Sequence, residues 1–181
     1  MRRRAVGPLA LAVVLGGATV AVAQPTWWIT GGGYAAVETG SLKDTVKTEG
    51  GAFVGGGWYL LRLGSVLVAA EAEASAGRVK ASLGIVEDTV TPFRGRLGLR
   101  ATRWEEHDEP TLVPHLRAGG VYRSDQGDLV KDDGAGWYVG IGLDYRLSEN
   151  WAVGPFATYE EVGLSVRART WFLGLGLTFA F

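Results

Sequence analysis

The last residues of the chain, 170–181, have the sequence TWFLGLGLTFAF and decide the fold. Large apolar side chains occupy alternate positions from Trp171 to Phe181, and the positions between them are mostly small. Side chains alternate across a β-strand, so one face of this segment is apolar and the other is mostly glycine, threonine and alanine. A soluble sandwich would carry charge or hydroxyls on its outer face. The pattern therefore predicts a strand that faces lipid on one side and a narrow barrel interior on the other.

The same alternation recurs towards the N-terminus. Segments of about 10 residues show it, which is the length that a tilted membrane strand requires. The first two segments carry aromatics and glycines on both faces, so their facing stays open. Since an open sheet edge cannot satisfy its backbone in lipid, the strands must close. We predict an all-β fold, an eight-stranded antiparallel up-and-down transmembrane β-barrel. The segments are 27–37, 52–62, 68–76, 93–102, 112–123, 137–146, 151–160 and 170–181.

The N-terminus indicates export. Three arginines at positions 2–4 precede an apolar run from Leu9 to Ala23, and Ala21-Val22-Ala23 has the pattern of a cleavage site. The alternative, a transmembrane anchor, needs about 20 apolar residues, and this run is shorter and contains two glycines. We predict a cleavable signal peptide over 1–23, export through the general secretory pathway, and a barrel domain over 24–181.

Composition limits the function classes. The chain has no cysteine, which excludes disulfides and thiolate metal sites, and its net charge of −1 offers no basic face to nucleic acid. The histidines are His107 and His115, and no serine lies within a few residues of His115. A hydrolase needs a serine positioned by a histidine, and a metal site needs several ligands, so we expect no enzyme, no cofactor and no metal.

The connections alternate in length. Tight turns are predicted near residues 63–64 and 148–149, whereas 38–50, 78–90, 124–135 and 161–168 are longer and polar. Periplasmic turns of such barrels are short and external loops are longer. The four longer segments are therefore predicted as external loops, and the long inner turn at 104–110 does not fit this pattern.

With these features the chain resembles the small outer-membrane β-barrels of the OmpA/OmpX type. The terminal strand carries the resemblance through Gly176, Phe179 and Phe181, which look like the signal that the barrel-assembly machinery reads. The segment VGIGLDY at 139–145, followed by LSENW at 147–151, is similar to a late hairpin of such barrels. The resemblance covers about 24–181 and implies residence in the cell outer membrane. It does not include a peptidoglycan-binding domain.

Charges concentrate on the predicted inner face. Nearly all charges within the strands occupy the alternate positions that form one face. An Arg or Lys on the lipid face near the midplane costs about 2–4 kcal/mol, so this face is predicted to point into the lumen. One interpretation is a polar plug of paired charges, and the alternative is a small, mildly anion-favouring conduit, because arginines outnumber the acids. The predicted lumen charge network comprises Glu71, Glu73, Arg94, Arg96, Arg100, Arg117, Asp144, Arg146 and Glu160.

The predicted role is therefore structural or surface-interacting, with a small-solute channel as the alternative and a lipid-modifying barrel enzyme as a remote one. Four aspartates in the segment 124–135 are candidates for contact with cations or basic partners. We expect a monomer whose partners are outer-membrane lipid and, during insertion, the barrel-assembly machinery.

Overall fold

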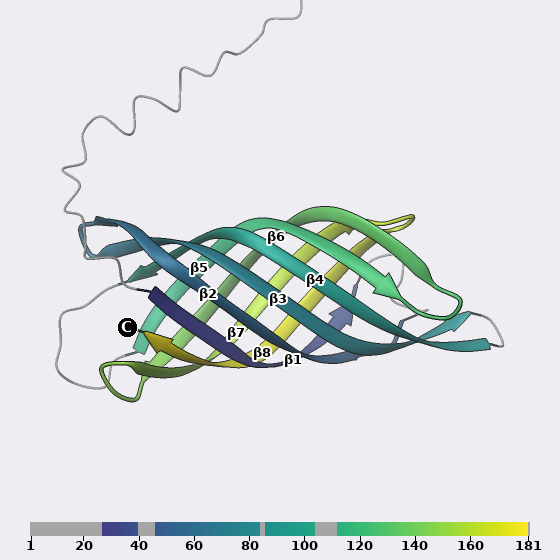
Figure 1. Cartoon of the computed structure of the whole chain (residues 1–181), viewed down its shortest axis with the longest axis horizontal. Helices are drawn as coiled ribbons and strands as arrows, with labels where there is room; N and C mark the ends of the chain where they lie inside the picture. The colour runs from purple at the N-terminus through teal and green to yellow at the C-terminus, as the bar shows by residue number, and fades with distance from the viewer. Residues whose placement is uncertain (1–26, 40–45, 84–85, 104–111, 181) are drawn as a thin grey trace, which may run out of the picture.

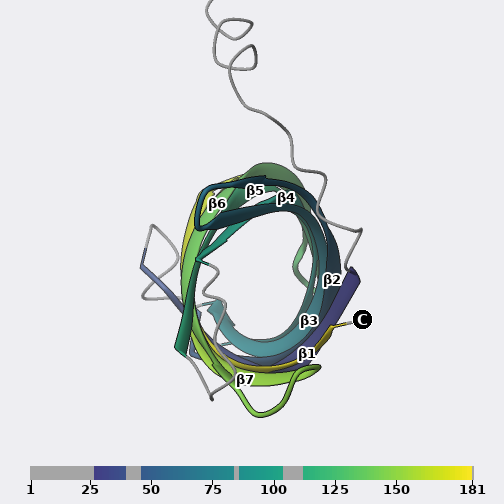
Figure 2. The ribbon, with the colours of Figure 1, turned by 90° about the vertical axis from the view of Figure 1, so that its left-hand side faces the viewer.

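The computed structural model describes residues 27–39, 46–83, 86–103 and 112–180. Its eight strands close into one barrel in which each strand pairs antiparallel with the next and β8 pairs with β1 (Figures 1 and 2). The predicted fold class is confirmed. The predicted signal peptide and Phe181 lie outside the described residues. The strands are β1 (Trp27–Glu38), β2 (Glu49–Leu63), β3 (Val66–Leu83), β4 (Val86–Arg103), β5 (Leu112–Gln126), β6 (Lys131–Arg146), β7 (Trp151–Gly163) and β8 (Arg167–Ala180).

Within these described ranges, no helix is long and apolar enough to cross a membrane.

The pairing register is staggered around the barrel. A path through paired residues leaves β8 at Leu177, enters β1 at Gly31, and returns to β8 at Arg167, ten residues away. A stagger of this kind requires strands tilted by about 35–45°. We call the end with Trp27 and Ala180 the terminus end, and the opposite end the hairpin end; they lie left and right in Figure 1.

The facing of the first two strands, left open by the sequence, follows from burial. In β1 the even positions point inward, including Trp28 and Tyr34, and in β2 the odd positions up to Tyr59 do so, including Phe53, before a register shift between Tyr59 and Leu61. Phe53 and Tyr34 pack with Phe172 in an apolar cluster inside the barrel. These aromatics belong to the lumen, which is why the outer-face pattern was ambiguous there.

The outward rows form an apolar belt between two aromatic girdles. Leu97 and Leu173, with 69% and 63% of their surface exposed, lie between the girdles. Such a belt flanked by aromatics is typical of a barrel wall in lipid. Trp27 and Trp58 stack with ring centroids 4.9 Å apart at the terminus end, and Tyr159 and Trp171 lie 5.1 Å apart towards the hairpin end. The girdle residues are Trp27, Trp58, Tyr145, Trp151 and Phe179 at the terminus end, and Phe93, Tyr122, Trp137, Tyr159 and Trp171 at the other.

The strands are longer than predicted, at 12 to 18 residues. Much of three segments predicted as loops, 78–90, 124–135 and 161–168, is therefore strand, and 78–90 is almost entirely the β3–β4 hairpin; of 38–50, strands include 38 and 49–50. The cause is local burial: Val79, Ala81 and Val90 form an apolar cluster with Val46 and Val130, which makes continued pairing favourable beyond the barrel. The predicted inner turn at 104–110 lies outside the described residues.

Two glycines of β4 give a test of the inner packing. A Cβ on Gly98 would meet the Ala118 carbonyl oxygen and the Tyr138 hydroxyl, whereas a Cβ on Gly95 would meet nothing within 4 Å. We expect Gly98→Val to lower the free energy of unfolding by about 1–3 kcal/mol, the usual cost of overpacking. Gly95→Val, on the outward face, should leave it unchanged or raise it. Urea unfolding of the folded barrel in lipid vesicles measures both, and equal effects would contradict this packing.

Candidate functional site: the charged lumen

An ion-pair network crosses the lumen near the hairpin end, starting from β4. The side chain of Arg94 points inward, and its Nη1 and Nη2 donate to the two carboxylate oxygens of Glu49 on β2, each at 2.7 Å. Its Nε donates to Glu160 Oε1 on β7 at 2.8 Å. Arg94 and Glu160 have fully buried side chains. One guanidinium therefore links strands on opposite sides of the ring.

Arg96 continues this network. It stands two residues along β4 on the same face, and its Nη2 donates to Glu160 Oε2 at 2.9 Å. Its Nη1 donates to Glu73 on β3, which also accepts from Arg117 Nη1 at 2.6 Å. Arg117 Nη2 reaches the Thr158 hydroxyl at 2.7 Å. The connected set Glu49, Glu73, Arg94, Arg96, Arg117 and Glu160 is called the lumen network below.

Aromatic rings hold the guanidinium groups from the side. Arg94 and Arg96 lie over the Phe172 ring, with Cζ 4.8 and 4.5 Å from its centroid, and Arg117 lies 5.1 Å from that of Phe156. Cations over ring faces gain electrostatic attraction, most when they are desolvated. The Tyr34 hydroxyl donates to Glu49 at 2.6 Å. The lumen network is therefore hydrogen-bonded along its edges and packed against rings on its faces.

A second group lies nearer the terminus end. Arg100 donates to Asp144, and its Nη2 lies 2.9 Å from His115 Nδ1, whose distance to Asp144 Oδ2 is 3.4 Å. The Arg100 guanidinium also lies 4.7 Å from the centroid of the Trp28 ring. These side chains come from β4, β5, β6 and β1, and the inward parity of each strand brings them together.

A third group lies at the hairpin end. Arg123 donates through Nη1 to Glu38 and through Nε to Asp125, at 2.7 and 2.8 Å, and Thr170 donates to Glu38 at 2.9 Å. All four residues are buried. Asp125 is thus engaged inside and not available to external cations. The sequence carried one signal for this group, since Arg123 shares the parity of Arg117.

The predicted site residues divide as follows. Glu73, Arg94, Arg96, Arg117 and Glu160 join one network, and Arg100 with Asp144 forms another. Glu71 instead accepts from the Tyr138 hydroxyl at 2.8 Å.

Three predicted residues lie elsewhere. Arg146 lines the opening at the terminus end. Gly176 faces the lumen opposite Gly154, and Phe179 packs on Trp151 at 4.8 Å.

The balance of charge differs from the prediction. Sequence reasoning missed Glu49 and Glu38 because both lie in the segment 38–50, which was predicted as an external loop, whereas Glu38 ends β1 and Glu49 begins β2. With these acids included, arginines do not outnumber acids among the described inward residues, so the basis of an anion-favouring lumen is lost. The inward acids are Glu38, Glu49, Glu71, Glu73, Asp125, Asp144 and Glu160, and the inward arginines are Arg94, Arg96, Arg100, Arg117, Arg123 and Arg146.

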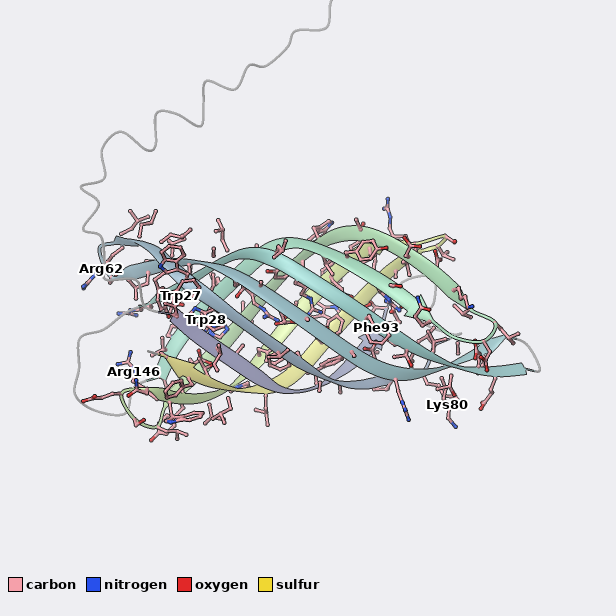
Figure 3. All side chains as sticks on the ribbon, in the orientation of Figure 1. Trp27, Trp28, Arg62, Lys80, Phe93 and Arg146 are labelled. Atoms are coloured by element: carbon pink, nitrogen blue, oxygen red, sulfur yellow. The ribbon has the colours of Figure 1, made fainter. Side chains whose placement is uncertain are left out.

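Little space is left between these side chains. A cavity of about 30 Å³ lies in mid-lumen, lined by Glu71, Arg100 and Arg117 among others, which is room for one or two waters. A wider opening of about 190 Å³ lies at the terminus end, beside Trp28, Asp144 and Arg146. Figure 3 places Arg146 at that end, far from Lys80.

At the hairpin end, Asp88 ties the β3–β4 hairpin to the β5–β6 connection. Its Oδ2 accepts from the backbone amides of Leu129 and Val130 at 3.0 and 3.1 Å. These amides hold the pKa of the Asp88 carboxyl below its usual value, led by the bond from Leu129. Next to it, the hydrogen bond and charge of Lys47, at 2.9 Å, lower the pKa of Glu87. The described part of this end is a surface of charged hairpins that are linked by hydrogen bonds.

The surroundings of His115 bear on the alternative of a barrel enzyme. The mid-lumen cavity that His115 lines has no serine among its described lining residues, and His115 is engaged with Arg100 and Asp144. Across the described ranges, no group of three or more metal-ligating side chains is present.

Comparison with known proteins points to a membrane barrel. The family described as "Outer membrane protein beta-barrel domain" matches residues 8–179. No curated protein matches the chain. Neisserial surface protein A is a similar solved structure, with 15% identity, a TM-score of 0.60, and coverage of 86% of this chain and 97% of that one. Ail of Yersinia pestis, the attachment invasion locus protein, has 12% identity, a TM-score of 0.54, and coverage of 87% and 100%. At such identities these structures bear on the fold alone.

Proposed function

Because the chain belongs to the family of outer membrane protein β-barrel domains, we propose that it is a non-enzymatic barrel whose lumen is closed by its own ion pairs and whose hairpin end faces the exterior. Residence in the outer membrane follows from the family. The proposed role is to support the envelope and to present ordered, charged hairpins to the surroundings as a monomer. Insertion would use the terminal strand, including Gly176 and Phe179.

The lumen network carries the proposal of a closed interior. Glu160 lies with no exposed side-chain surface between Arg94 and Arg96, and the three are joined across the ring. Eight-stranded barrels have interiors just wide enough for side chains to fill. Passage of a solute would require breaking several charge-assisted hydrogen bonds at once, and each is stronger than a neutral one.

The hairpin end supports a surface role. Small barrels of this class extend farther outside than inside, and here the β3–β4 hairpin continues past the girdle at that end, with Val79 paired to Val90 and Lys80 to Thr89. Ail has been solved in complex with the heparin analogue sucrose octasulfate, at a TM-score of 0.50 and 14% identity to this chain. That complex shows that a barrel of this fold can bind a polyanion, and the present hairpin end carries exposed Lys47, Lys80 and Arg167.

A second candidate is a small-solute channel. The opening at the terminus end leads towards the cavity in mid-lumen, since Trp28, Arg100, Asp144 and Thr178 line both. A rearrangement of the lumen network would connect them to the hairpin end.

Conductance separates the two candidates. We expect the protein in planar bilayers near neutral pH to show no steady open state, because the lumen network leaves no continuous path. A steady conductance that follows protein insertion would contradict the closed lumen and favour the channel.

The orientation has its own test. A single cysteine in place of Thr89 should react with an impermeant maleimide on intact cells, and one in place of Ser148 should not. The reverse pattern would contradict an external hairpin end.

A further inference from the structure

The outer wall of the barrel has an apolar hollow that leads up to its hairpin-end rim. It has a volume of about 640 Å³ and lies across β2, β3, β4 and β5. Ala74, Ala76 and Gly95 form its shallow floor, because they are the outward residues paired across β3 and β4, and Phe93 and Tyr122 rise beside them. The volume is within the range of small-molecule sites. This hollow in the outer wall leaves space close to the strand backbones that is wide enough for alkyl chains.

Two cations stand directly above this hollow. Arg78 and Lys80 follow Ala76 on β3 with the same outward parity, and both are exposed. Arg78 pairs in register with Gly50, which has no side chain to cover it. Neither cation shares a hydrogen bond with a carboxylate among the described side chains, whereas Lys47 nearby is paired with Glu87. Lys80 also acts on Glu87 through its charge, which helps to lower the pKa of that carboxyl. Figure 3 shows Lys80 beyond Phe93 towards the hairpin end.

A second pair of cations on the rim differs. Arg167 and Arg169 on β8 also face outward, but both contact Glu161, at 3.5 and 2.9 Å. That pair is partly neutralised within the protein. On β3 the charge of Lys80 is partly offset by Glu87, whereas Arg78 has no carboxylate bonded to it among the described side chains and can hold an external anion, with an apolar hollow below it.

We propose that this hollow and the cations above it bind lipid A, the phosphorylated glycolipid of the outer leaflet, with its acyl chains against Ala74, Ala76 and Gly95 and a phosphate on Arg78 and Lys80. The choice of an outer-leaflet lipid rests on the proposed orientation. Basic residues at a membrane surface attract anionic headgroups, and apolar contact adds to this attraction. The hollow and the two cations follow one another along β3. One lipid molecule with a charged headgroup and several acyl chains can therefore contact both.

The test compares retention of lipid A by the purified full-length barrel in neutral detergent, by mass spectrometry of the intact complex. Wild type should retain bis-phosphorylated lipid A and lose most of this retention when the phosphates are removed. The double variant R78Q/K80Q should bind about tenfold more weakly, since each basic residue near an anionic headgroup contributes severalfold. The matched control R167Q/R169Q removes the same charge and should bind within about twofold of wild type, because Glu161 already offsets part of the charge of those cations.

A third variant tests the hollow without changing charge. Ala76→Trp fills the floor below Arg78 and should weaken binding, while the shift in gel mobility on heating reports that the barrel still folds. Equal retention by wild type and R78Q/K80Q, or an equal loss in R167Q/R169Q, would overturn the proposal. So would equal retention of phosphatidylglycerol, which would mean a general attraction for anionic lipid. Lipid binding in detergent does not depend on which end of the barrel faces the exterior. The labelling of a cysteine at Thr89, which tests that orientation, can therefore fail while the lipid-binding test succeeds, or the reverse.

Discussion

Replacing Glu160 with glutamine should lower the free energy of unfolding by about 3–5 kcal/mol, the cost of removing one partner from a buried ion pair. Glu160 accepts from Arg94 Nε at 2.8 Å and from Arg96 Nη2 at 2.9 Å, and its side chain has no exposed surface. Glutamine keeps the shape but removes the charge, so two guanidinium groups remain buried with one carboxylate fewer between them. Urea titration in lipid vesicles measures the loss.

The adjacent residue supplies the control. Glu161 has the opposite parity, faces outward, and pairs with Arg167 and Arg169 while its side chain is 20% exposed. Such a surface pair contributes about 0–1 kcal/mol. Glu161→Gln should therefore change the free energy of unfolding little. Similar losses in the two variants, or no loss in Glu160→Gln, would contradict the lumen network.

Replacing Leu97 with arginine should destabilise the folded barrel in lipid by about 2–4 kcal/mol. Leu97 is the most exposed large apolar residue of the described outer wall, and it lies between the two aromatic girdles. An arginine at the midplane of a lipid-facing wall costs about this much, and the cost falls towards the interfaces. The preceding residue, Arg96, carries the same group at no such cost because it faces the lumen.

Thr89→Arg on the same strand and face is the control. Thr89 pairs with Lys80 in the part of the β3–β4 hairpin that extends beyond the girdles. Arginine there should cost less than about 1 kcal/mol. The measurement is reversible unfolding in vesicles. Equal costs at both positions would mean that Leu97 does not face the bilayer interior.

The barrel follows from the sequence because membrane strands separate their chemistry by parity. In β4, β6 and β8 the large apolar residues mostly fill one row, and the other row is mainly small, polar or charged, so the facing could be predicted. In β1 and β2 it could not, because Tyr34 and Phe53 are apolar residues of the lumen and glycines lie on both faces. Which face of a strand points inward can be predicted from alternate positions only when the two faces differ in chemistry.

The candidate site was predicted in part for the same reason. Arg94, Arg96 and Arg100 share one row of β4, and their inward direction was clear. Their partners depend on register and stagger, which the sequence does not specify. Glu49 on β2 binds Arg94 on β4 past the strand between them, and Glu71 accepts from Tyr138 although an arginine row lies on the neighbouring strand.

The strand ends were not predictable from polarity. Residues 78–90 are polar enough to suggest a loop, yet Val79 and Val90 pair and bury each other. The long hairpin is a tertiary effect, since Val46 and Val130 come from other connections.

Fluorescence along β3 tests the central claim, a lipid-facing outer row and a closed inner row. The chain has no cysteine, so single cysteines at Ala72, Ala74 and Ala76, which face outward, and at Ala69 and Ser75, which face inward, can each carry a small fluorophore. We predict that brominated lipids quench the fluorophore strongly at the three outward positions and weakly at the two inward ones. Quenching that does not alternate with residue number would contradict the barrel in lipid described here.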